Sequence, residues 1–336
     1  DAPEAAPVTT LAELSAIVTR SADGTVKING EATVDAPDIV GTNGVIHGVD
    51  TVIMPANIVK LVSAHPALTS LATAVTTLML VDALSATDGA GFTVFAPTDA
   101  AFAAFVAGQD ALDNFDAFLS LPGTASEIVT YHATAAGAIK ADDLAPAQFV
   151  KTLSEDYHAV VTKTDADGVM VNKKATVTTA DIIGTNGIIH VVDKVFTPAT
   201  ITGLATAHPD FSTLVTALAQ EDLATTFDAK DMSYTVFAPN NAAFEGEIMG
   251  NMDLDSVEDL LGLENLANIL KFHAIGSAVM STDLQPQQTV ESLFTDNSLE
   301  IISGEDGVTV QGTAVTAPDI KAKNGVIHGI EGVLIP

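Results

Sequence analysis

The chain has 336 residues, of which 47% are hydrophobic, a proportion typical of folded proteins. Its 43 Asp and Glu against 13 Lys and Arg give a formal net charge of −30 at pH 7, and a surface this acidic repels nucleic acid and anionic membranes, so we expect neither as a partner. The absence of cysteine excludes disulfide bonds and thiol chemistry, and no apolar run reaches the roughly 18 residues that a membrane span needs.

Residues 1–55 carry a pattern typical of β-structure. Apolar and polar residues alternate in them, which predicts strands over 17–19, 25–28, 32–34 and 45–53. They contain the box Gly41-Thr-Asn-Gly-Val-Ile-His47. We expect Asn43 and Gly44 to turn the chain with positive φ angles, and the ring of His47 to be partly buried and to hold the turn.

Residues 56–198 begin with a helical part. The pair His65-Pro66 predicts the opening of the first helix, because a proline in the first turn loses no hydrogen bond. A short strand is expected over 93–96, and the segment from Pro97 to Asp99 ends it and offers oxygen atoms that cap the next helix. Strands over 157–162, 169–172 and 175–178 are expected to follow, and then the box returns as Gly184-Thr-Asn-Gly-Ile-Ile-His190.

Residues 199–336 repeat the same series. The Thr-Val-Phe-Ala-Pro strand returns as Thr235 to Pro239, and the box returns as Lys323-Asn-Gly-Val-Ile-His328. The histidines that end the three boxes are 143 and 138 residues apart. A period of that length has the size of a domain and is too long for a solenoid repeat. The chain is therefore predicted to be a series of duplicated modules, of which the first lacks its helical half.

These boxes, in a fixed order and with an aromatic–histidine pair between them, resemble the fasciclin-type adhesion domain family. The pair is Tyr131-His132 in residues 56–198 and Phe272-His273 in residues 199–336. The resemblance implies an α+β fold in which each module is a wedge-shaped β-sandwich with packed helices. We therefore predict tandem fasciclin-like domains: the C-terminal half of one in residues 1–55, and one full domain in each of the two segments that follow.

The resemblance also indicates candidate site residues. Tyr131 and His132 resemble the integrin-binding mark of the family, whereas Phe272 beside His273 lacks the phenol hydroxyl. The favoured alternative is an aromatic residue and a histidine of the core at the end of a helix. Repeated histidines could also indicate a metal site, but they lack ligand spacing, so a structural role is favoured for the box. Its residues are Asn43, His47, Asn186, His190, Asn324 and His328.

No pattern in the sequence indicates an enzyme, since it contains no nucleophile elbow, phosphate loop or zinc helix motif. We expect no catalytic residue, no cofactor and no metal. Carboxylates crowd residues 245–264, where Asn251-x-Asp253-x-Asp255 resembles the start of a calcium loop. Ser256 stands where that loop needs glycine, so a solvated acidic surface is the favoured interpretation.

A string of such modules is predicted to act by contact. We expect a secreted or cell-surface protein of the extracellular matrix that binds protein, either itself or another surface protein, with a surface filament as one form of assembly. Residues 1–55 alone would leave an apolar face and sheet edges uncovered, to be completed by a missing upstream segment or by a neighbouring chain. The alternative from another class is a carrier of a small apolar ligand or lipid, which requires a large apolar cavity.

Overall fold

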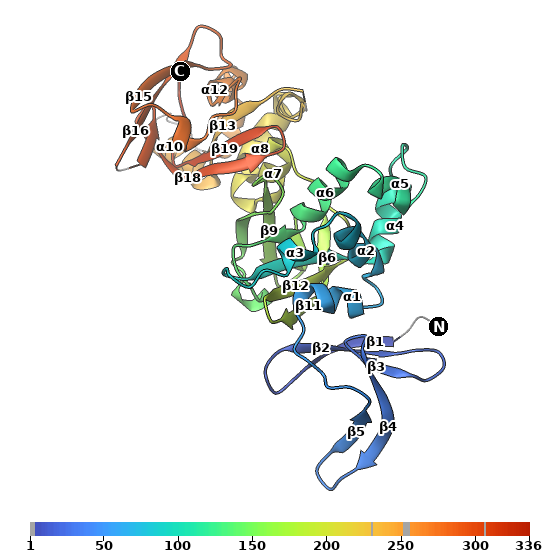
Figure 1. Ribbon diagram of the computed structural model, residues 1–336. Helices are drawn as coiled ribbons and strands as arrows, with labels where there is room; N and C mark the ends of the chain where they lie inside the picture. The colour runs from blue at the N-terminus through green and yellow to red at the C-terminus, as the bar shows by residue number, and fades with distance from the viewer. Residues whose placement is uncertain (1–3, 230, 251–255, 306) are drawn as a thin grey trace. The chain divides into compact units, whose positions relative to one another are not determined.

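The computed structural model describes residues 4–229, 231–250, 256–305 and 307–336, and within them the chain forms three β-sheets in succession (Figure 1). Contacts divide the chain into two compact units, one of residues 1–146, 150–155 and 163–197 and the other of residues 147–149, 156–162 and 198–336. Helices and sheets both occur in each unit, so the fold is α+β, as predicted.

The first sheet has five strands, each antiparallel to its neighbours, in chain order. They are β1 (Glu4–Thr9), β2 (Ser15–Arg20), β3 (Val26–Ile28), β4 (Ala32–Val40) and β5 (Val45–Val49). The four predicted strands are confirmed, although β5 ends at Val49 and not at residue 53. The pattern missed β1, because its sequence Glu-Ala-Ala-Pro-Val-Thr has no alternation and contains a proline.

The middle module consists of a mainly helical half followed by a β-rich half. Its helices are α1 (Ile58–Ala64), α2 (Thr69–Thr77), α3 (Val81–Leu84), α4 (Asp99–Ala107), α5 (Phe115–Leu119), α6 (Pro122–Tyr131) and the 3₁₀ turn η1 (Ala141–Asp143). Its strands are β6 (Phe92–Pro97), β7 (Ala133–Thr134), β8 (Ala147–Lys151), β9 (His158–Thr164), β10 (Gly168–Val171), β11 (Ala175–Gly184) and β12 (Gly187–Val192).

The last module repeats this series. Its helices are α7 (Ile201–Ala207), α8 (Ser212–Gln220), α9 (Ala224–Phe227), α10 (Asn241–Gly250), α11 (Val257–Leu261) and α12 (Leu266–Phe272), with 3₁₀ turns η2 (Pro209–Phe211) and η3 (Ser281–Asp283). Its strands are β13 (Tyr234–Pro239), β14 (Ala274–Ile275), β15 (Gln287–Glu291), β16 (Ser298–Gly304), β17 (Gly307–Val310), β18 (Thr313–Ala322) and β19 (Gly325–Ile330).

The two complete modules share one topology. The strand order is β7-β6-β12-β11-β10-β9-β8 in the middle module and β14-β13-β19-β18-β17-β16-β15 in the last. Strand β6 runs parallel to β12 with Phe95 opposite His190, and β13 runs parallel to β19 with Phe237 opposite His328. In the same order β1 to β5 correspond to β8 to β12, so the described residues before α1 contain no counterpart of β6, of β7 or of any helix.

The first helix of each complete module begins earlier than the sequence pattern predicts. Helix α1 starts at Ile58, because the side-chain oxygen of Asn57 accepts a hydrogen bond from the N–H of Lys60 at 2.9 Å and caps it. The prediction that His65-Pro66 opens the first helix is therefore wrong, since this pair lies between α1 and α2. Thr200 caps α7 in the same way.

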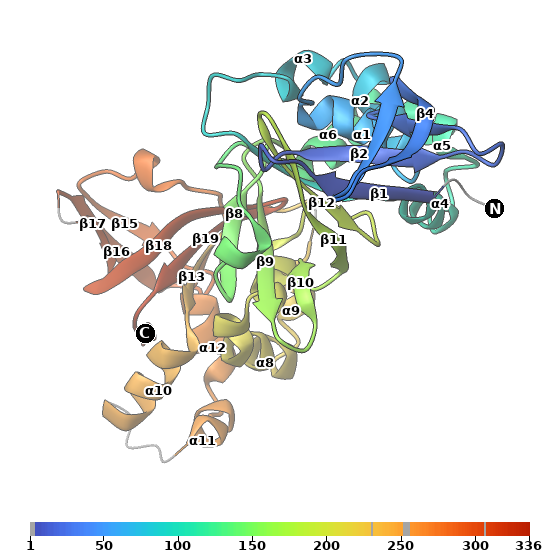
Figure 2. The same ribbon diagram turned by 90° about the horizontal axis from the view of Figure 1, so that it is seen from below.

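In both complete modules the helices pack on the sheet through one apolar core. Phe102 of α4 and Ile189 of β12 belong to this core in the middle module and are 2% and 0% exposed. Phe244 of α10 and Ile327 of β19 hold the same positions in the last module and are each 1% exposed. Figure 2 shows helices α8, α10, α11 and α12 gathered on one side of the strands of the last module.

Candidate functional site

The asparagine of the box ties the sheet to the helical half of each complete module. The Oδ1 atom of Asn186 accepts from the N–H of Ile58 at 3.0 Å, and Nδ2 donates to the carbonyls of Leu84 and Ala86 at 2.9 and 3.1 Å. Asn324 makes the same three bonds, to the N–H of Ile201 at 2.9 Å and to the carbonyls of Phe227 and Ala229 at 2.7 and 3.1 Å. One side chain therefore fixes the start of the first helix and the end of the third.

The glycine of the box allows a close approach of two strands. A Cβ atom on Gly187 would overlap the carbonyl oxygen of Phe92 on β6, and one on Gly325 would overlap that of Tyr234 on β13. The prediction that Asn-Gly supplies positive φ is wrong for the asparagines and for two of the glycines, since only Gly325 has such an angle, of 148°. In the two complete modules the asparagine contributes three hydrogen bonds, and the glycine leaves room for the carbonyl of the neighbouring strand.

The histidine of the box links a bulge in the sheet to the segment that follows β7. The bulged Asp181 has a φ of 60° and donates its N–H to Nδ1 of His190 at 3.3 Å, while Nε2 lies 2.9 Å from the carbonyl of Ile139. His328 lies between the N–H of Asp319, at 3.1 Å, and the carbonyl of Val279, at 3.0 Å. Since Nδ1 accepts in both, the ring proton is on Nε2.

Both of these histidines are buried and hydrogen-bonded within their own module. Their exposed fractions are 0% for His190 and 2% for His328, and burial lowers the pKa of each, although the carbonyl bond and the nearby aspartate oppose this effect. Sequence analysis missed Asp38, Asp181 and Asp319, which form the bulges. Their signal is an Asp-Ile pair that occurs nine residues before each histidine.

The box in residues 1–55 has the same local shape without these partners. The N–H of Asp38 donates to Nδ1 of His47 at 3.2 Å, and the φ of Asp38 is 62°. Among the described residues, nothing forms a hydrogen bond with Nε2 of His47 or with the side chain of Asn43. A Cβ atom on Gly44 would meet no atom within 4 Å.

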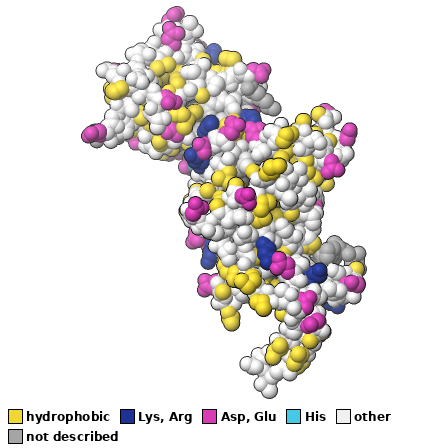
Figure 3. Space-filling model, in the orientation of Figure 1, with side chains coloured by type: hydrophobic (Ala, Val, Ile, Leu, Met, Phe, Trp, Pro, Cys, Tyr) yellow, Lys and Arg dark blue, Asp and Glu magenta, His cyan; other side chains and the backbone are white. Residues whose placement is uncertain are grey.

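Apolar side chains around this first box are exposed. Ile39 and Ile46 are 52% and 64% exposed, whereas their counterparts Ile182 and Ile189 are 1% and 0% exposed. Hydrophobic side chains gather on the pair β4–β5 at the lower end of the space-filling view (Figure 3). The free edge of β5 and these side chains are the candidate functional site, and we call them the β5 edge.

The opposite end of the first sheet packs on the middle module. Ile17 of β2 is 0% exposed and belongs to the core under α1 and α2. The hydroxyl of Ser15 accepts from the N–H of Ile183 on β11 at 2.8 Å, and Lys60 of α1 pairs with Glu31 at 2.6 Å. The first sheet is therefore held in place at β2, while no described strand covers the β5 edge.

The aromatic–histidine pair of the middle module lies inside the core. Tyr131 is 1% exposed and its hydroxyl accepts from Nδ2 of Asn172 at 3.1 Å. His132 is 2% exposed, with Nδ1 at 2.8 Å from the carbonyl of Ile128 and Nε2 accepting from the N–H of Phe196 at 3.2 Å. Burial lowers the pKa of His132 to about 4. Neither side chain is available at the surface of the folded module.

The pair in the last module has the same environment. Phe272 and His273 are each 2% exposed. His273 places Nδ1 at 2.8 Å from the carbonyl of Ile269, and its Nε2 accepts from the N–H of Leu334 at 2.8 Å. Burial lowers its pKa to about 4 as well. In both modules the histidine thus joins the end of the helical half to the last residues of the β half.

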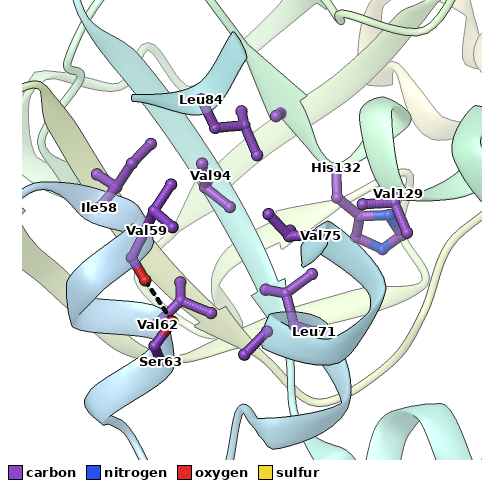
Figure 4. Close-up of a pocket in the computed structure, with 12 residues that line it drawn as sticks. Ile58, Val59, Val62, Ser63, Leu71, Val75, Leu84, Val94, Val129 and His132 are labelled. Carbon is purple, nitrogen blue, oxygen red and sulfur yellow. Dashed lines mark hydrogen bonds between the residues drawn. The ribbon is translucent and has the colours of Figure 1, made fainter. Parts of the chain in front are cut away.

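An apolar cavity lies between the helices and the sheet of the middle module, lined by residues such as Leu71, Val75, Leu84, Val129 and His132 (Figure 4). Its volume is about 20 Å³, far below the several hundred Å³ of ordinary ligand pockets. The last module has larger residues at two of these positions, Phe227 for Leu84 and Leu270 for Val129. This cavity is too small for a lipid.

A larger hollow of about 510 Å³ lies beside the second box, between the loop 86–92, the segment 135–140 and the turn 183–188. Glycine and alanine make up much of its wall, and among the described residues Lys140 is the one basic residue that lines it. Its size is in the range of small-molecule pockets.

Among the residues that the structure describes, no group of three or more His, Asp and Glu could hold a metal ion. The proposed start of a calcium loop, Asn251 to Asp255, lies outside the described residues. Next to it, the hydroxyl of Ser256 caps α11 by accepting from the N–H of Asp259 at 3.2 Å. No helix in the described part of the chain is both long and apolar enough to cross a membrane.

The topology and the repeated boxes define a protein of tandem duplicated α+β domains. Residues 1–55, 66–198 and 209–336 match the Fasciclin domain family, which is most of the chain. The chain therefore belongs to the fasciclin family and contains tandem repeats of its domain.

Relatives and a solved structure agree with this assignment. Transforming growth factor-beta-induced protein ig-h3 of Sus scrofa is 28% identical over 313 residues, which are 92% of this chain and 42% of that protein. Protein sll1483 of Synechocystis sp. is 38% identical over 140 residues, which are 41% of this chain and 73% of that protein. A FAS1 domain pair from the insect cell adhesion molecule Fasciclin I has a TM-score of 0.52 and 19% identity, over 80% of this chain and 97% of that one.

Proposed function

We propose that this chain is an extracellular adhesion or structural protein, secreted or held at a cell surface or in the matrix, that acts through protein–protein contacts of its fasciclin domains and not through catalysis. Its family supports this, as does the likeness of its fold to a domain pair of an insect cell adhesion molecule. The observation that carries the proposal is the β5 edge, where Ile39, Val45 and Ile46 are 52%, 53% and 64% exposed. An open strand edge beside apolar side chains is a surface that binds protein.

Our domain boundaries are residues 1–55 for a C-terminal half-domain, and 56–198 and 199–336 for two full domains. The family match begins only at residues 66 and 209 in the full domains. Helices α1 and α7 precede these points, and the N–H groups of Ile58 and Ile201 are bound by Asn186 and Asn324 of the same domains. These bonds support the earlier boundaries.

For Tyr131, His132, Phe272 and His273 we favour a role in the core over a role as an adhesion mark. All four side chains are at most 2% exposed. A partner that reads the surface of the folded domain would not reach them. The same reasoning favours a structural role for the box residues of the two full domains, whose asparagine and histidine side chains are bonded within their own domain.

The partner at the β5 edge is a protein, either this chain itself or another surface protein. Completion by an upstream segment would close the half-domain, whereas completion by a neighbouring chain would join molecules into a filament. Strand addition at an open edge provides main-chain hydrogen bonds for either form of completion. A net charge of −30 makes an anionic membrane or nucleic acid an unfavourable occupant of the same edge.

A bead-clustering assay tests the adhesion role. Ile46→Lys places a charge on the β5 edge, and Ile302→Lys is its matched control, because Ile302 lies on β16 of a complete domain and is 44% exposed. We expect beads coated with the chain or with Ile302→Lys to cluster, and beads coated with Ile46→Lys to stay largely dispersed. Equal clustering by all three proteins, or no clustering of the unsubstituted chain, would argue against self-adhesion through this edge.

The alternative function, a carrier of a small apolar ligand or lipid, draws its support from the hollow of about 510 Å³ beside the second box. Ala138 lies in its wall, so Ala138→Trp would fill it. If the chain is a carrier, an apolar fluorescent probe binds the unsubstituted chain and not this variant. We favour adhesion, because the charged residues Asp88 and Lys140 line this hollow and do not suit an apolar ligand, and the cavity inside the middle domain, of about 20 Å³, has no room for one.

A further inference from the structure

We propose that the β5 edge is a docking site for the first half of a fasciclin domain, the kind of segment that residues 56–143 represent in the middle domain. The incoming half brings its Thr-Val-Phe-Ala-Pro strand alongside β5 in parallel and lays its helices over the exposed face. This inference rests on the proposed function, since it names the partner of the same edge. Its basis is a comparison of three copies of one box, of which two are covered and one is open.

The strand register is set by the two covered copies. Gly187 lies opposite Phe92 and His190 opposite Phe95, and in the last domain Phe237 lies opposite His328 in the same parallel pairing. Gly44 and the first residues of β5 have the same pattern, Gly44-Val-Ile-His47, which is identical to that of the last domain and differs from the middle one only in Val45 for Ile188. The phenylalanine of an incoming Thr-Val-Phe-Ala-Pro strand is therefore placed opposite His47.

The polar groups of the open box match what such a segment offers. In the covered copies the asparagine binds one N–H from the start of the first helix and two carbonyls near the end of the third. The histidine forms a hydrogen bond with one more carbonyl. The side chain of the bulged aspartate accepts an N–H: Asp181 accepts from Ala141 at 2.9 Å, and Asp319 accepts from Ser281 at 2.6 Å. Asn43, His47 and Asp38 present the same atoms to solvent.

The apolar face matches in the same way. Ile39, Ile46 and Ile53 are 52%, 64% and 41% exposed. At the position of Ile53 the full domains have Phe196 and Leu334, each 1% exposed. The N–H of Phe196 donates to His132, and that of Leu334 donates to His273. Residues 4–54 contain no such histidine, so the incoming half also supplies the acceptor for this N–H.

Gly44 is the most specific sign that a further strand pairs with β5. In the described structure a side chain at this position would meet nothing within 4 Å, and the φ of Gly44 is not in the left-handed region. Nothing within residues 4–55 therefore requires glycine here. In both covered copies the equivalent glycine is required, because the carbonyl of the first residue of β6 or of β13 lies against it.

A second copy of this chain is a less suitable occupant. Its two Thr-Val-Phe-Ala-Pro strands are already internal, since β6 lies between β7 and β12, and β13 lies between β14 and β19. To donate either strand, the second copy would have to open a folded domain. A segment that carries only the first half of a domain has no such cost.

The test is a fusion that supplies a first half next to the β5 edge. Asp143 is followed by Leu144-Ala-Pro146 and then β8, and Asp1-Ala-Pro3 precedes β1 in the same way, so residues 56–143 are placed directly before Asp1 of the full chain. We expect hydrogen exchange of the backbone amides of residues 45–49 to slow by about tenfold or more in the fusion, because the open edge becomes paired. Unchanged exchange in these residues would overturn the proposal.

Two variants make the test specific. Gly44→Ala is expected to abolish this protection in the fusion, while in the unfused chain it leaves the thermal unfolding curve and the circular dichroism spectrum unchanged. Thr42→Ala is the matched control, because Thr42 and its counterpart Thr185 are exposed in both the open and the covered box. Protection that survives Gly44→Ala, or that is lost equally in Thr42→Ala, would show that the strand does not pair in the proposed register.

Sedimentation and hydrogen exchange of the unfused chain show whether a second copy occupies the edge instead. Bead clustering needs only weak contacts between the apolar side chains of many molecules, so we expect the unfused chain to sediment as a monomer with residues 45–49 unprotected. A stable dimer whose residues 45–49 are already protected would mean that a second copy completes the sheet, and the proposal would then be wrong. The adhesion role can fail on its own. In that case the unfused chain does not cluster beads, although residues 45–49 are protected in the fusion. Conversely, if the chain clusters beads but residues 45–49 exchange as fast in the fusion as in the unfused chain, this inference is wrong and the adhesion role stands.

Discussion

The ring of Phe196 lies 3.8 Å from that of His132 between centroids, and the N–H of Phe196 donates to Nε2 of this histidine at 3.2 Å. His273 receives the same bond from Leu334 in the last domain, at 2.8 Å. A histidine at the end of the helical half therefore holds the final segment of the β half. Because each ring donates through Nδ1 and accepts through Nε2, only the neutral form makes both bonds.

Acidification is expected to destabilise both full domains through these two histidines. Burial lowers their pKa from 6.5 to about 4, against the opposing effect of the carbonyl bond. Because the folded state has the lower pKa, the unfolded chain binds the proton first. The contribution of each neutral histidine to the free energy of unfolding is thus fully present above about pH 6.5. It decreases as the pH falls towards 4, by roughly 3 kcal/mol per histidine. Urea unfolding at several pH values across this range measures the slope.

His132→Phe serves as the control for this slope. The variant loses two hydrogen bonds and is less stable at neutral pH, but the middle domain then has one titrating group fewer. Its free energy of unfolding is expected to vary less with pH between 6.5 and 4 than that of the unsubstituted domain. An identical slope in the two proteins would assign the pH dependence to other groups.

Asn186→Ala is expected to destabilise the middle domain strongly. It removes three hydrogen bonds and leaves the buried N–H of Ile58 without its acceptor, at a cost of about 2–4 kcal/mol. Asn43→Ala is the matched control in the first box, where the side chain is exposed, and it should leave the unfolding curve unchanged. Calorimetry of the two variants separates these outcomes, and equal destabilisation would mean that the first box is already covered.

Tyr131→Phe distinguishes a core role from an adhesion role. The substitution removes the hydrogen bond from Nδ2 of Asn172 to the hydroxyl, so we expect a loss of about 1 kcal/mol in the free energy of unfolding. The last domain has Phe272 at this position and shows that the fold accepts it. Bead clustering should be unchanged, since the ring is 1% exposed. Clustering that fails while the domain remains folded would assign Tyr131 to a binding surface after all.

Association of the chain is expected to increase with salt. The net charge of −30 makes approaching molecules repel each other, and the screening length falls from about 30 Å at 0.01 M salt to about 8 Å at 0.15 M. Light scattering at these two salt concentrations measures the average mass, and circular dichroism shows whether the fold is the same. A mass that does not change with salt would contradict this prediction, and a response to micromolar calcium alone would indicate an ion site in residues 245–264.

Local sequence patterns predicted much of the fold. The Thr-Val-Phe-Ala-Pro segments became β6 and β13, and the alternating segments became β9 to β11, because strand formation follows patterns within a few residues. The interpretation of His65-Pro66 was wrong, since the cap at Asn57 lies just outside the pattern and starts a helix earlier. The turn chemistry expected of Asn-Gly was also wrong, because the pair is required by contacts with β6 and the helices and not by its own backbone.

The sequence by itself determined that one module is repeated, that it is α+β, and which residues recur in each copy. Only the tertiary structure decided what those residues do. Asn43 and Asn186 lie in the same local sequence, Gly-Thr-Asn-Gly, yet one is exposed and the other is 6% exposed with three hydrogen bonds. The partner of Asn186 at Ile58 is 128 residues away along the chain. Segments far away along the chain bury the box and form its hydrogen bonds. Identical local sequences therefore have different environments when one copy is covered by such a segment and another is not.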